Sequence, residues 1–272
     1  MAHSRAVICG LARDIGSLTE ALRCRVEALG SMFADYRVVL YENDSRDDTR
    51  PQLETWCTEN PKAELLTEVR HDPVNPTTRC LARAERMAFY RNQYHNHISE
   101  RFAAFDFAVV VDTDLAGGWS YEGIADTFGH ASWDGVGSYG LIYKRRGMRP
   151  NVLLHYDAWA YRFYGSDAPL TCRTVNNMQL GRGEPLLPVN SCFGGLAVYR
   201  MPAFLSARYA GGDAEHVPFH RDMRAAGFDR LFLNPSQIAL YGRRRRRLDP
   251  LYRAWHRTAR LAIPSWGPAW RY

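Results

Sequence analysis

Residues 105–114 read FDFAVVVDTD, a predominantly apolar run that ends in two aspartates separated by one residue. An apolar run without regular polar alternation is typical of a strand buried on both faces, as in the centre of a parallel sheet. We therefore predict a central strand over residues 105–111, with Asp112 and Asp114 at its carboxyl end. In open α/β sheets, ligands bind at that edge.

The segments before this strand alternate between strand and helix patterns. Apolar runs predict strands at 5–9 and 36–41, and helical spacing predicts helices at 14–29, 49–60 and 79–97. This order is typical of a parallel, right-handed sheet flanked by helices. Further strands are expected at 137–143 and 194–199. The composition of residues 144–188, rich in Gly, Pro and Arg, predicts mobile loops.

Composition narrows the class of protein. A chain of 272 residues with 46% hydrophobic residues suits one sizeable α/β domain and excludes wholesale disorder. No run reaches the roughly 18–20 apolar residues of a membrane-spanning helix, and the first residues lack a signal-peptide pattern. Six scattered cysteines without zinc-site spacing predict free thiols. The sequence thus predicts a cytoplasmic protein.

The positive charge is concentrated at the end of the chain. Residues 241–272 contain nine arginines and one aspartate, a charge of +8, so the total of +6 leaves −2 for residues 1–240. Arginines 243–247 precede an aromatic amphipathic pattern, and residues 243–263 predict a basic helix that binds an anionic membrane surface. The alternatives are a helix packed on the body and, less favoured, a nucleic-acid patch.

Asp112 and Asp114 offer two hard oxygen ligands at one point of the sheet edge. Mn²⁺ or Mg²⁺ suits such a pair, because these ions keep several waters and bridge phosphate oxygens. The alternative is that the triplet only caps a turn or a helix.

A second acidic stretch, YENDSRDDTR at 41–50, follows the predicted strand 36–41. Glu42 and Asp44 are expected at the same edge as Asp112, where carboxylates can accept hydrogen bonds from a nucleobase or a ribose. Arg13, just after the first strand, could balance phosphate or position the base. Residues 47–49 are interpreted as the start of a helix, where acids and Thr satisfy free N–H groups.

These motifs, in this order, resemble the nucleotide-sugar glycosyltransferases of the GT-A fold. The resemblance covers roughly residues 5–240 and includes the segment RAERMAFYRN at 83–92. Three later elements are similar to the capsule-associated α-mannosyltransferases: DAWAYR at 157–162, SCFGG at 191–195 and EHV at 215–217. The chain departs from most GT-A enzymes in having no DGS after the second strand.

The resemblance implies a Rossmann-like, mostly parallel sheet with a nucleotide-binding half at 1–134 and an acceptor-side half at 135–240. It implies transfer of a hexose, with mannose favoured, from a nucleoside-diphosphate sugar to a glycan or lipid-linked acceptor, as in polysaccharide biosynthesis. GDP-mannose is favoured as donor, and a UDP-sugar stays open. The enzyme would lie in the cytoplasm or peripherally on the cytoplasmic face of a membrane.

The resemblance also implies roles for individual residues. Asp112 and Asp114 would hold the metal, with His216 as a further ligand. Glu215 would act as base or stabilise an oxocarbenium-like centre, and its alternative is a helix N-terminal acid beside a surface His. The residues expected to bind the nucleotide sugar are Arg13, Glu42, Asp44, Arg83, Arg91, Asp112, Gly194 and Gly195. Trp159 and Arg162 would bind the acceptor, with Asp157 lining the same site as a candidate catalytic residue; the alternative for Trp159 is a core position.

Two other enzyme classes use the same metal logic. A haloacid-dehalogenase-like phosphohydrolase also places D-x-D after an apolar strand, but that strand usually comes first and the second Asp is followed two residues later by Thr or Val. A sugar nucleotidyltransferase usually begins with a Gly-rich phosphate loop, of which residues 10–14 are a poor version. A lipid- or nucleic-acid-binding module would not explain acids at two strand ends.

Overall fold

The computed structural model describes residues 1–76, 80–146 and 149–242. The strands are β1 Arg5–Ala12, β2 Asp35–Asn43, β3 Ala63–Glu68, β4 Phe107–Asp112, β5 Gly118–Trp119, β6 Gly135–Arg146, β7 Arg149–His155, β8 Arg162–Phe163, β9 Leu187–Ser191, β10 Leu196–Arg200 and β11 Leu231–Tyr241. The helices are α1 Thr19–Gly30, α2 Thr49–Glu59, α3 Leu81–Arg101, α4 Tyr121–Gly129, α5 Cys172–Asn176, α6 Met201–Leu205 and α7 His216–Ala225.

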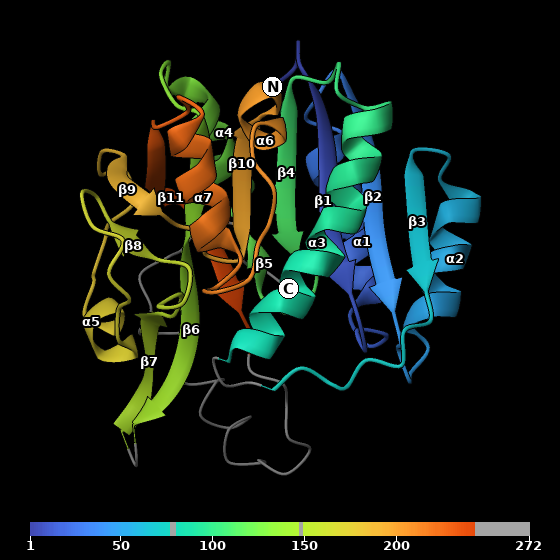
Figure 1. The fold of residues 1–272 in the computed structure, drawn as a ribbon, viewed down its shortest axis with the longest axis horizontal. Coiled ribbons are helices and arrows are strands. Elements are labelled where there is room, and N and C mark those ends of the chain that lie inside the picture. Colours follow the sequence, from blue (N-terminus) through green and yellow to red (C-terminus); the bar gives the residue numbers. More distant parts are fainter. Residues whose placement is uncertain (77–79, 147–148, 243–272) are drawn as a thin grey trace.

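The strands form one mixed sheet in the order β3-β2-β1-β4-β10-β6-β11-β9-β8 (Figure 1). Neighbours in the β3-β2-β1-β4 half are parallel, as are β6 and β11. Strand β10 lies antiparallel to both β4 and β6. The prediction of a mostly parallel central sheet flanked by helices is therefore confirmed.

The sheet separates two hydrophobic cores because its buried strands alternate their side chains between the two faces. One core gathers Val7 and Cys9 of β1 with residues of α3, α6 and α7, including Tyr94 and Phe219. The other gathers Ala6 and Ile8 with residues of α1, α2 and α4. Figure 1 shows α3 and α7 in front of the sheet and α1 behind it. Both faces of β4 are thus covered, as the apolar run of its sequence requires.

Parallel pairing brings three strand ends to one edge. In the register, Asp112 at the end of β4 lies opposite Leu11 of β1, and Glu42 of β2 lies opposite Ala12. This is the lower edge of β1, β2 and β4 in Figure 1. Glu42 and Asp112, at the carboxyl ends of β2 and β4, therefore lie at the same edge of the sheet, with β1 between them.

The predicted elements of residues 1–112 are all present, with shifted ends. The sequence patterns did not predict β3, and beyond β4 they did not predict β5, α4, β9, α6, α7 or β11. Strand β11 could not be recognised in the sequence because Pro235 interrupts its strand pattern. Its pairing with β6 shifts register between Asn234 and Ile238. Proline removes a ladder hydrogen bond, and in a strand it is tolerated at such an irregularity. Segment 144–188, expected as loops, contains β7, β8 and α5.

Two further expectations can be compared with the described residues. None of the six cysteines is in a disulfide. No helix in the described part of the chain is long and apolar enough to cross a membrane. The predicted basic helix at 243–263 lies outside the described residues.

Candidate active site

The two aspartates of the D-x-D motif lie at the carboxyl end of β4, and the backbone around them is fixed. The amide of Asp112 donates to the carbonyl of Gly195 at 2.8 Å, and the hydroxyl of Thr113 donates to the carbonyl of Leu11 at 2.6 Å. The Asp112 side chain is 24% exposed, whereas Asp114 is exposed. The motif thus presents both carboxylates at the edge while its central Thr ties β4 to β1.

A buried ion pair lies behind Asp112. Nε of Arg91, on α3, donates to Oε1 of Glu215 at 2.8 Å, and an Nη of the same guanidinium lies 3.4 Å from Oδ1 of Asp112. The side chains of Arg91 and Glu215 are only 3% and 7% exposed. Glu215 immediately precedes α7. Arg91 therefore joins α3, β4 and the start of α7. Its burial favours a role in positioning Asp112 over the expected direct contact with a nucleotide sugar.

Negative charge is in excess around Asp112. Burial raises the pKa of this carboxyl to about 7, with a further rise from the charges of Asp114, Glu215 and Asp157, while Arg91 opposes the rise. Four carboxylates therefore face one guanidinium. A divalent cation would relieve this repulsion and favour the ionised form of Asp112.

The donor set fits a hard cation that the protein holds with few ligands. Within residues 1–76, 80–146 and 149–242, no three His, Cys, Asp or Glu side chains are grouped so as to hold a metal ion. The carboxylates of Asp112 and Asp114 could supply two oxygen ligands, and Mg²⁺ typically takes one or two carboxylates together with water and phosphate.

His216 is buried beside this arrangement, with its Nε2 3.8 Å from Oε1 of Glu215. Its ring stacks on Phe193 with centroids 3.9 Å apart, it is 2% exposed, and burial, with a smaller contribution from Arg91, lowers its pKa well below the usual value. Neither ring nitrogen has a hydrogen-bond partner among the described residues. The imidazole is neutral and buried, whereas the alternative interpretation of residues 215–216 expected a His on the surface. The role of His216 as a metal ligand stays a prediction.

Gly194 and Gly195 pass closely behind the aspartates. Their φ values of 64° and 88° are in the left-handed region that favours glycine. A Cβ on Gly194 would clash with the carbonyl oxygen of Ser138. Oδ2 of Asp157 accepts a hydrogen bond from the amide of Gly194 at 2.7 Å, and Asp157 is 8% exposed. Asp157 therefore holds the glycine turn in place, and its expected catalytic role stays a prediction.

Glu42 keeps a free acceptor at the same edge. This residue is 1% exposed; its Oε1 accepts from the amide of Ser45 at 2.9 Å. Its Oε2 is buried and has no partner among the described residues. Arg13 donates to the carbonyls of Asp72 at 2.8 Å and Pro73 at 3.3 Å, while its buried Nε has no partner among those residues. A buried polar group without a partner is costly, so a ligand that supplies one is favoured here.

Asp44, in contrast, has a structural role. Its φ is 55°, and its carboxylate accepts hydrogen bonds from the amides of Arg70 and His71 at 2.9 Å and of Asp72 at 3.0 Å. Burial alone would raise the pKa, but these amides lower it to about 2. The expected contact between Asp44 and a ligand is therefore replaced by a clamp on the segment that follows β3.

The end of the acidic stretch begins a helix, as predicted. Oδ1 of Asp47 accepts from the amide of Thr49 at 3.0 Å, and Oδ2 accepts from the amide of Gly16 at 2.9 Å. Asp48 makes no side-chain capping bond. Asp47 is therefore the acid that satisfies the start of α2 and also ties it to the segment before α1.

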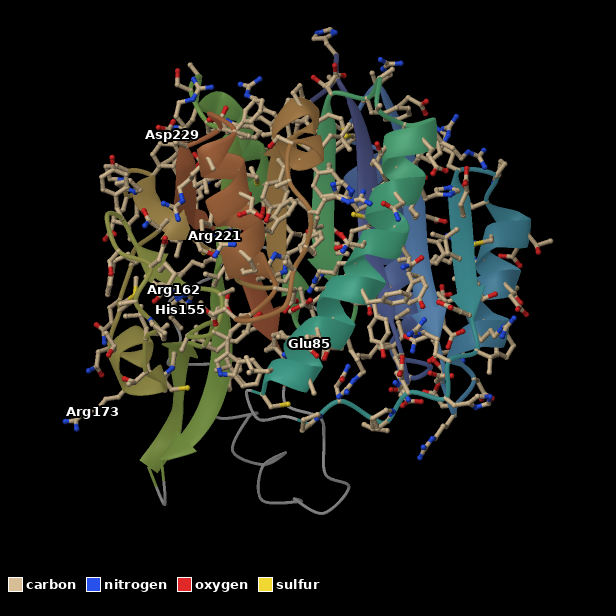
Figure 2. The ribbon with its side chains drawn as sticks, viewed as in Figure 1. Glu85, His155, Arg162, Arg173, Arg221 and Asp229 are labelled. Atoms are coloured by element: carbon tan, nitrogen blue, oxygen red, sulfur yellow. The ribbon has the colours of Figure 1, made fainter. Side chains whose placement is uncertain are left out.

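The two predicted acceptor residues differ. Arg162 is fully buried and donates to Asp213 at 2.6 Å and to the carbonyl of Trp159 at 3.0 Å; it is labelled beside His155 in Figure 2. It is structural, so the expectation that it binds an acceptor is not supported. Trp159 is half-buried, and the guanidinium of Arg83 lies 4.8 Å from the centre of its ring. This cation–π pair links α3 to the segment before β8.

Two tyrosines near the aspartates were not anticipated. The hydroxyl of Tyr241 donates to Asp114 at 2.7 Å and lies 3.4 Å from Asp112, and the ring of Tyr156 packs against that of Tyr241 at 4.7 Å. Tyr241 ends the strand that the sequence reading missed, so no local signal pointed to it. Tyr156 directly precedes Asp157, which was the available hint.

No family model matches the chain, and the search of curated proteins finds no match. Among solved structures, the mannosyltransferase PcManGT from Pyrobaculum calidifontis, in complex with GDP-Man and Mn²⁺, is similar at 12% identity with a TM-score of 0.53, over 99% of this chain and 67% of that one. S. aureus TarS 1-349 with UDP-GlcNAc is similar at 14% identity with a TM-score of 0.48, over 89% and 60%. Glucosyl-3-phosphoglycerate synthase from Mycobacterium tuberculosis is similar at 13% identity with a TM-score of 0.48, over 97% and 82%.

The likeness to the mannosyltransferase shows the fold, which is that of the GT-A glycosyltransferases. The two matches with TM-scores of 0.48 carry no further argument.

Proposed function

We propose that the protein is a metal-dependent glycosyltransferase that moves a hexose from a nucleoside-diphosphate sugar to a glycan or lipid-linked acceptor. The observation that carries the proposal is the Asp112–Asp114 pair at the carboxyl end of β4 in a GT-A fold, with negative charge in excess around it. A phosphohydrolase or nucleotidyltransferase is not favoured, because the solved structure that is similar over 99% of this chain is a mannosyltransferase.

In this proposal Asp112 and Asp114 hold Mn²⁺ or Mg²⁺. The bound cation would neutralise the charge that develops on the leaving diphosphate. Arg91 and Glu215 keep Asp112 in place through their buried ion pair. Glu215 is thereby a positioning residue, because a carboxylate engaged with a guanidinium is a poor base for an acceptor hydroxyl.

The nucleoside would lie over the ends of β1 and β2. Oε2 of Glu42 is the free acceptor there for a ribose hydroxyl or a base N–H. Gly194 and Gly195 let the backbone approach the donor sugar closely. We favour GDP-mannose as donor, supported by the mannosyltransferase whose structure contains GDP-Man, with a UDP-sugar as the alternative.

The acceptor would bind beside Trp159. Its half-buried ring offers an apolar face that suits a sugar, with Arg83 on the ring as a charged neighbour. We also propose that residues 243–263 bind a membrane surface, which would agree with a lipid-linked acceptor.

The test is thermal unfolding with GDP, UDP, CDP or ADP, each with Mn²⁺ or EDTA. A ligand at one hundred times its dissociation constant stabilises by about 2.7 kcal/mol. We expect a shift with one nucleoside diphosphate, lost in EDTA and in Asp114→Ala. Asp229→Asn is the matched control, because Asp229 is an exposed acid far from this edge (Figure 2). No shift with any nucleotide, together with metal-dependent phosphate release from a simple phosphomonoester, would replace the proposal with a phosphohydrolase.

A further inference from the structure

The hydroxyl of Tyr241 lies on the two carboxylates of the D-x-D motif. Its oxygen is 2.7 Å from Oδ1 of Asp114 and 3.4 Å from Oδ2 of Asp112. The tyrosine hydroxyl is the donor in both contacts, and a carboxylate oxygen is the acceptor. The hydroxyl of Tyr241 is thus close enough to both carboxylates to interact with the two at once.

The rest of Tyr241 is held by the fold. Its backbone is the last residue of β11, opposite Ile142 in the pairing with β6. Its ring packs edge-on against Tyr156, with ring centroids 4.7 Å apart. The strand backbone and the ring packing thus hold the hydroxyl at the two carboxylates.

We propose that Tyr241 competes with the divalent cation for the Asp112–Asp114 pair: a cation bound to both carboxylates would displace the hydroxyl that contacts them. This inference rests on the proposed function, because it takes the pair as the cation site. Tyr241 thereby lowers the affinity for free cation, since the hydrogen bond to Asp114 must be broken first. It also gives the cation-free site a donor for acids that would otherwise face one another.

The experiment measures Mn²⁺ binding by calorimetry, without nucleotide, to the wild-type chain, Tyr241→Phe and Tyr156→Phe. Phenylalanine keeps the ring stack and removes only the hydroxyl. We expect Tyr241→Phe to bind Mn²⁺ about tenfold more tightly, which is about 1.4 kcal/mol. Tyr156→Phe is the matched control, because the Tyr156 hydroxyl has no hydrogen-bond partner among the described residues, and its affinity should stay within about twofold of wild type.

A second readout is the tyrosine ultraviolet difference spectrum on addition of Mn²⁺. It should be present in the wild-type chain and in Tyr156→Phe, and lost in Tyr241→Phe. Equal or weaker Mn²⁺ binding by Tyr241→Phe would overturn the competition while leaving the cation site intact. Equal tightening in both variants would also overturn it. No binding by either the wild-type chain or Tyr241→Phe, as in Asp114→Ala, would overturn both the competition and the proposed cation site.

Discussion

Nε of Arg91 and Oε1 of Glu215 lie 2.8 Å apart although 124 positions separate the two residues in the chain. Both side chains are nearly inaccessible to solvent, and the same guanidinium reaches Asp112. The pair therefore couples the long helix α3 to the start of α7 directly behind the proposed cation site. The five predictions that follow concern this ion pair, the residues near the proposed cation site and the basic segment at 243–263.

Removing Glu215 should destabilise the fold strongly. In Glu215→Ala the guanidinium of Arg91 loses its closest partner in a buried place, and breaking a buried pair costs about 3–5 kcal/mol. Urea unfolding measures the loss. The matched control is Asp222→Ala, which removes the exposed partner of Arg221 (Figure 2) and should change the free energy of unfolding by less than about 1 kcal/mol. Equal effects would show that the Arg91–Glu215 pair has no special weight.

Asp44 should make stability depend on acid pH. Its folded-state pKa of about 2 lies below the ordinary value of 3.8, so its stabilising effect is present above pH about 4 and is lost as pH falls towards 2. Urea midpoints of the wild-type chain and Asp44→Asn should therefore differ most near neutral pH and converge in acid. Asp48→Asn is the matched control, because its side chain makes no capping bond, and at neutral pH it should change the urea midpoint less than Asp44→Asn does. A constant gap for Asp44→Asn would contradict the amide clamp.

Cation binding should release protons at neutral pH. Because the pKa of Asp112 is raised to about 7 in the cation-free fold, a fraction of this carboxyl is protonated there and must ionise to bind a metal. Mn²⁺ affinity should rise with pH between about 6 and 8. Calorimetry in buffers of different ionisation enthalpy would detect the released proton, and Asp112→Asn should abolish it. The same heat in every buffer would argue against Asp112 as a ligand.

Alanine at Gly194 should cost more than strain alone. The position combines a φ of 64° with a clash between the new Cβ and the backbone of Ser138. Gly165 is a control with a φ of 75° and open space around its Cβ, so Gly165→Ala should cost only the left-handed strain of about 1–2 kcal/mol. Gly194→Ala should exceed it by about 1–3 kcal/mol in urea unfolding, since overpacking adds to strain. Equal losses would show that the turn can relax.

The basic segment should direct the protein to anionic membranes. We expect the full chain to sediment with anionic vesicles and to stay in solution with neutral ones, because each basic residue near the lipid contributes roughly 1 kcal/mol. Replacing arginines 243–247 by glutamine should abolish sedimentation, and high salt should weaken it. Equal pelleting with both vesicle types, or with neither, would rule out this role for the segment.

The candidate site could be predicted only in part from the sequence. Asp112, Asp114 and Glu42 were recognised because each follows an apolar strand, and parallel strands place their carboxyl ends on one edge. Asp44 follows the same strand as Glu42, and Asp157 and Arg162 were expected from the resemblance, yet the polar atoms of all three are engaged by the protein itself. Residue type and spacing do not reveal whether a carboxylate or guanidinium finds an internal partner, because that partner comes from another part of the chain.

The sequence by itself determined three neighbouring strands of the parallel half of the sheet, β1, β2 and β4, and the place of the D-x-D motif. The run at 105–111 can be buried on both faces only in the middle of such a sheet, and that requirement is local. The tertiary structure decided what surrounds the motif. Tyr241 reaches Asp112 across 129 positions because β11 pairs with β6 beside the antiparallel β10. Such long-range contacts depend on the order and register of the strands, which only the packing of the whole chain selects.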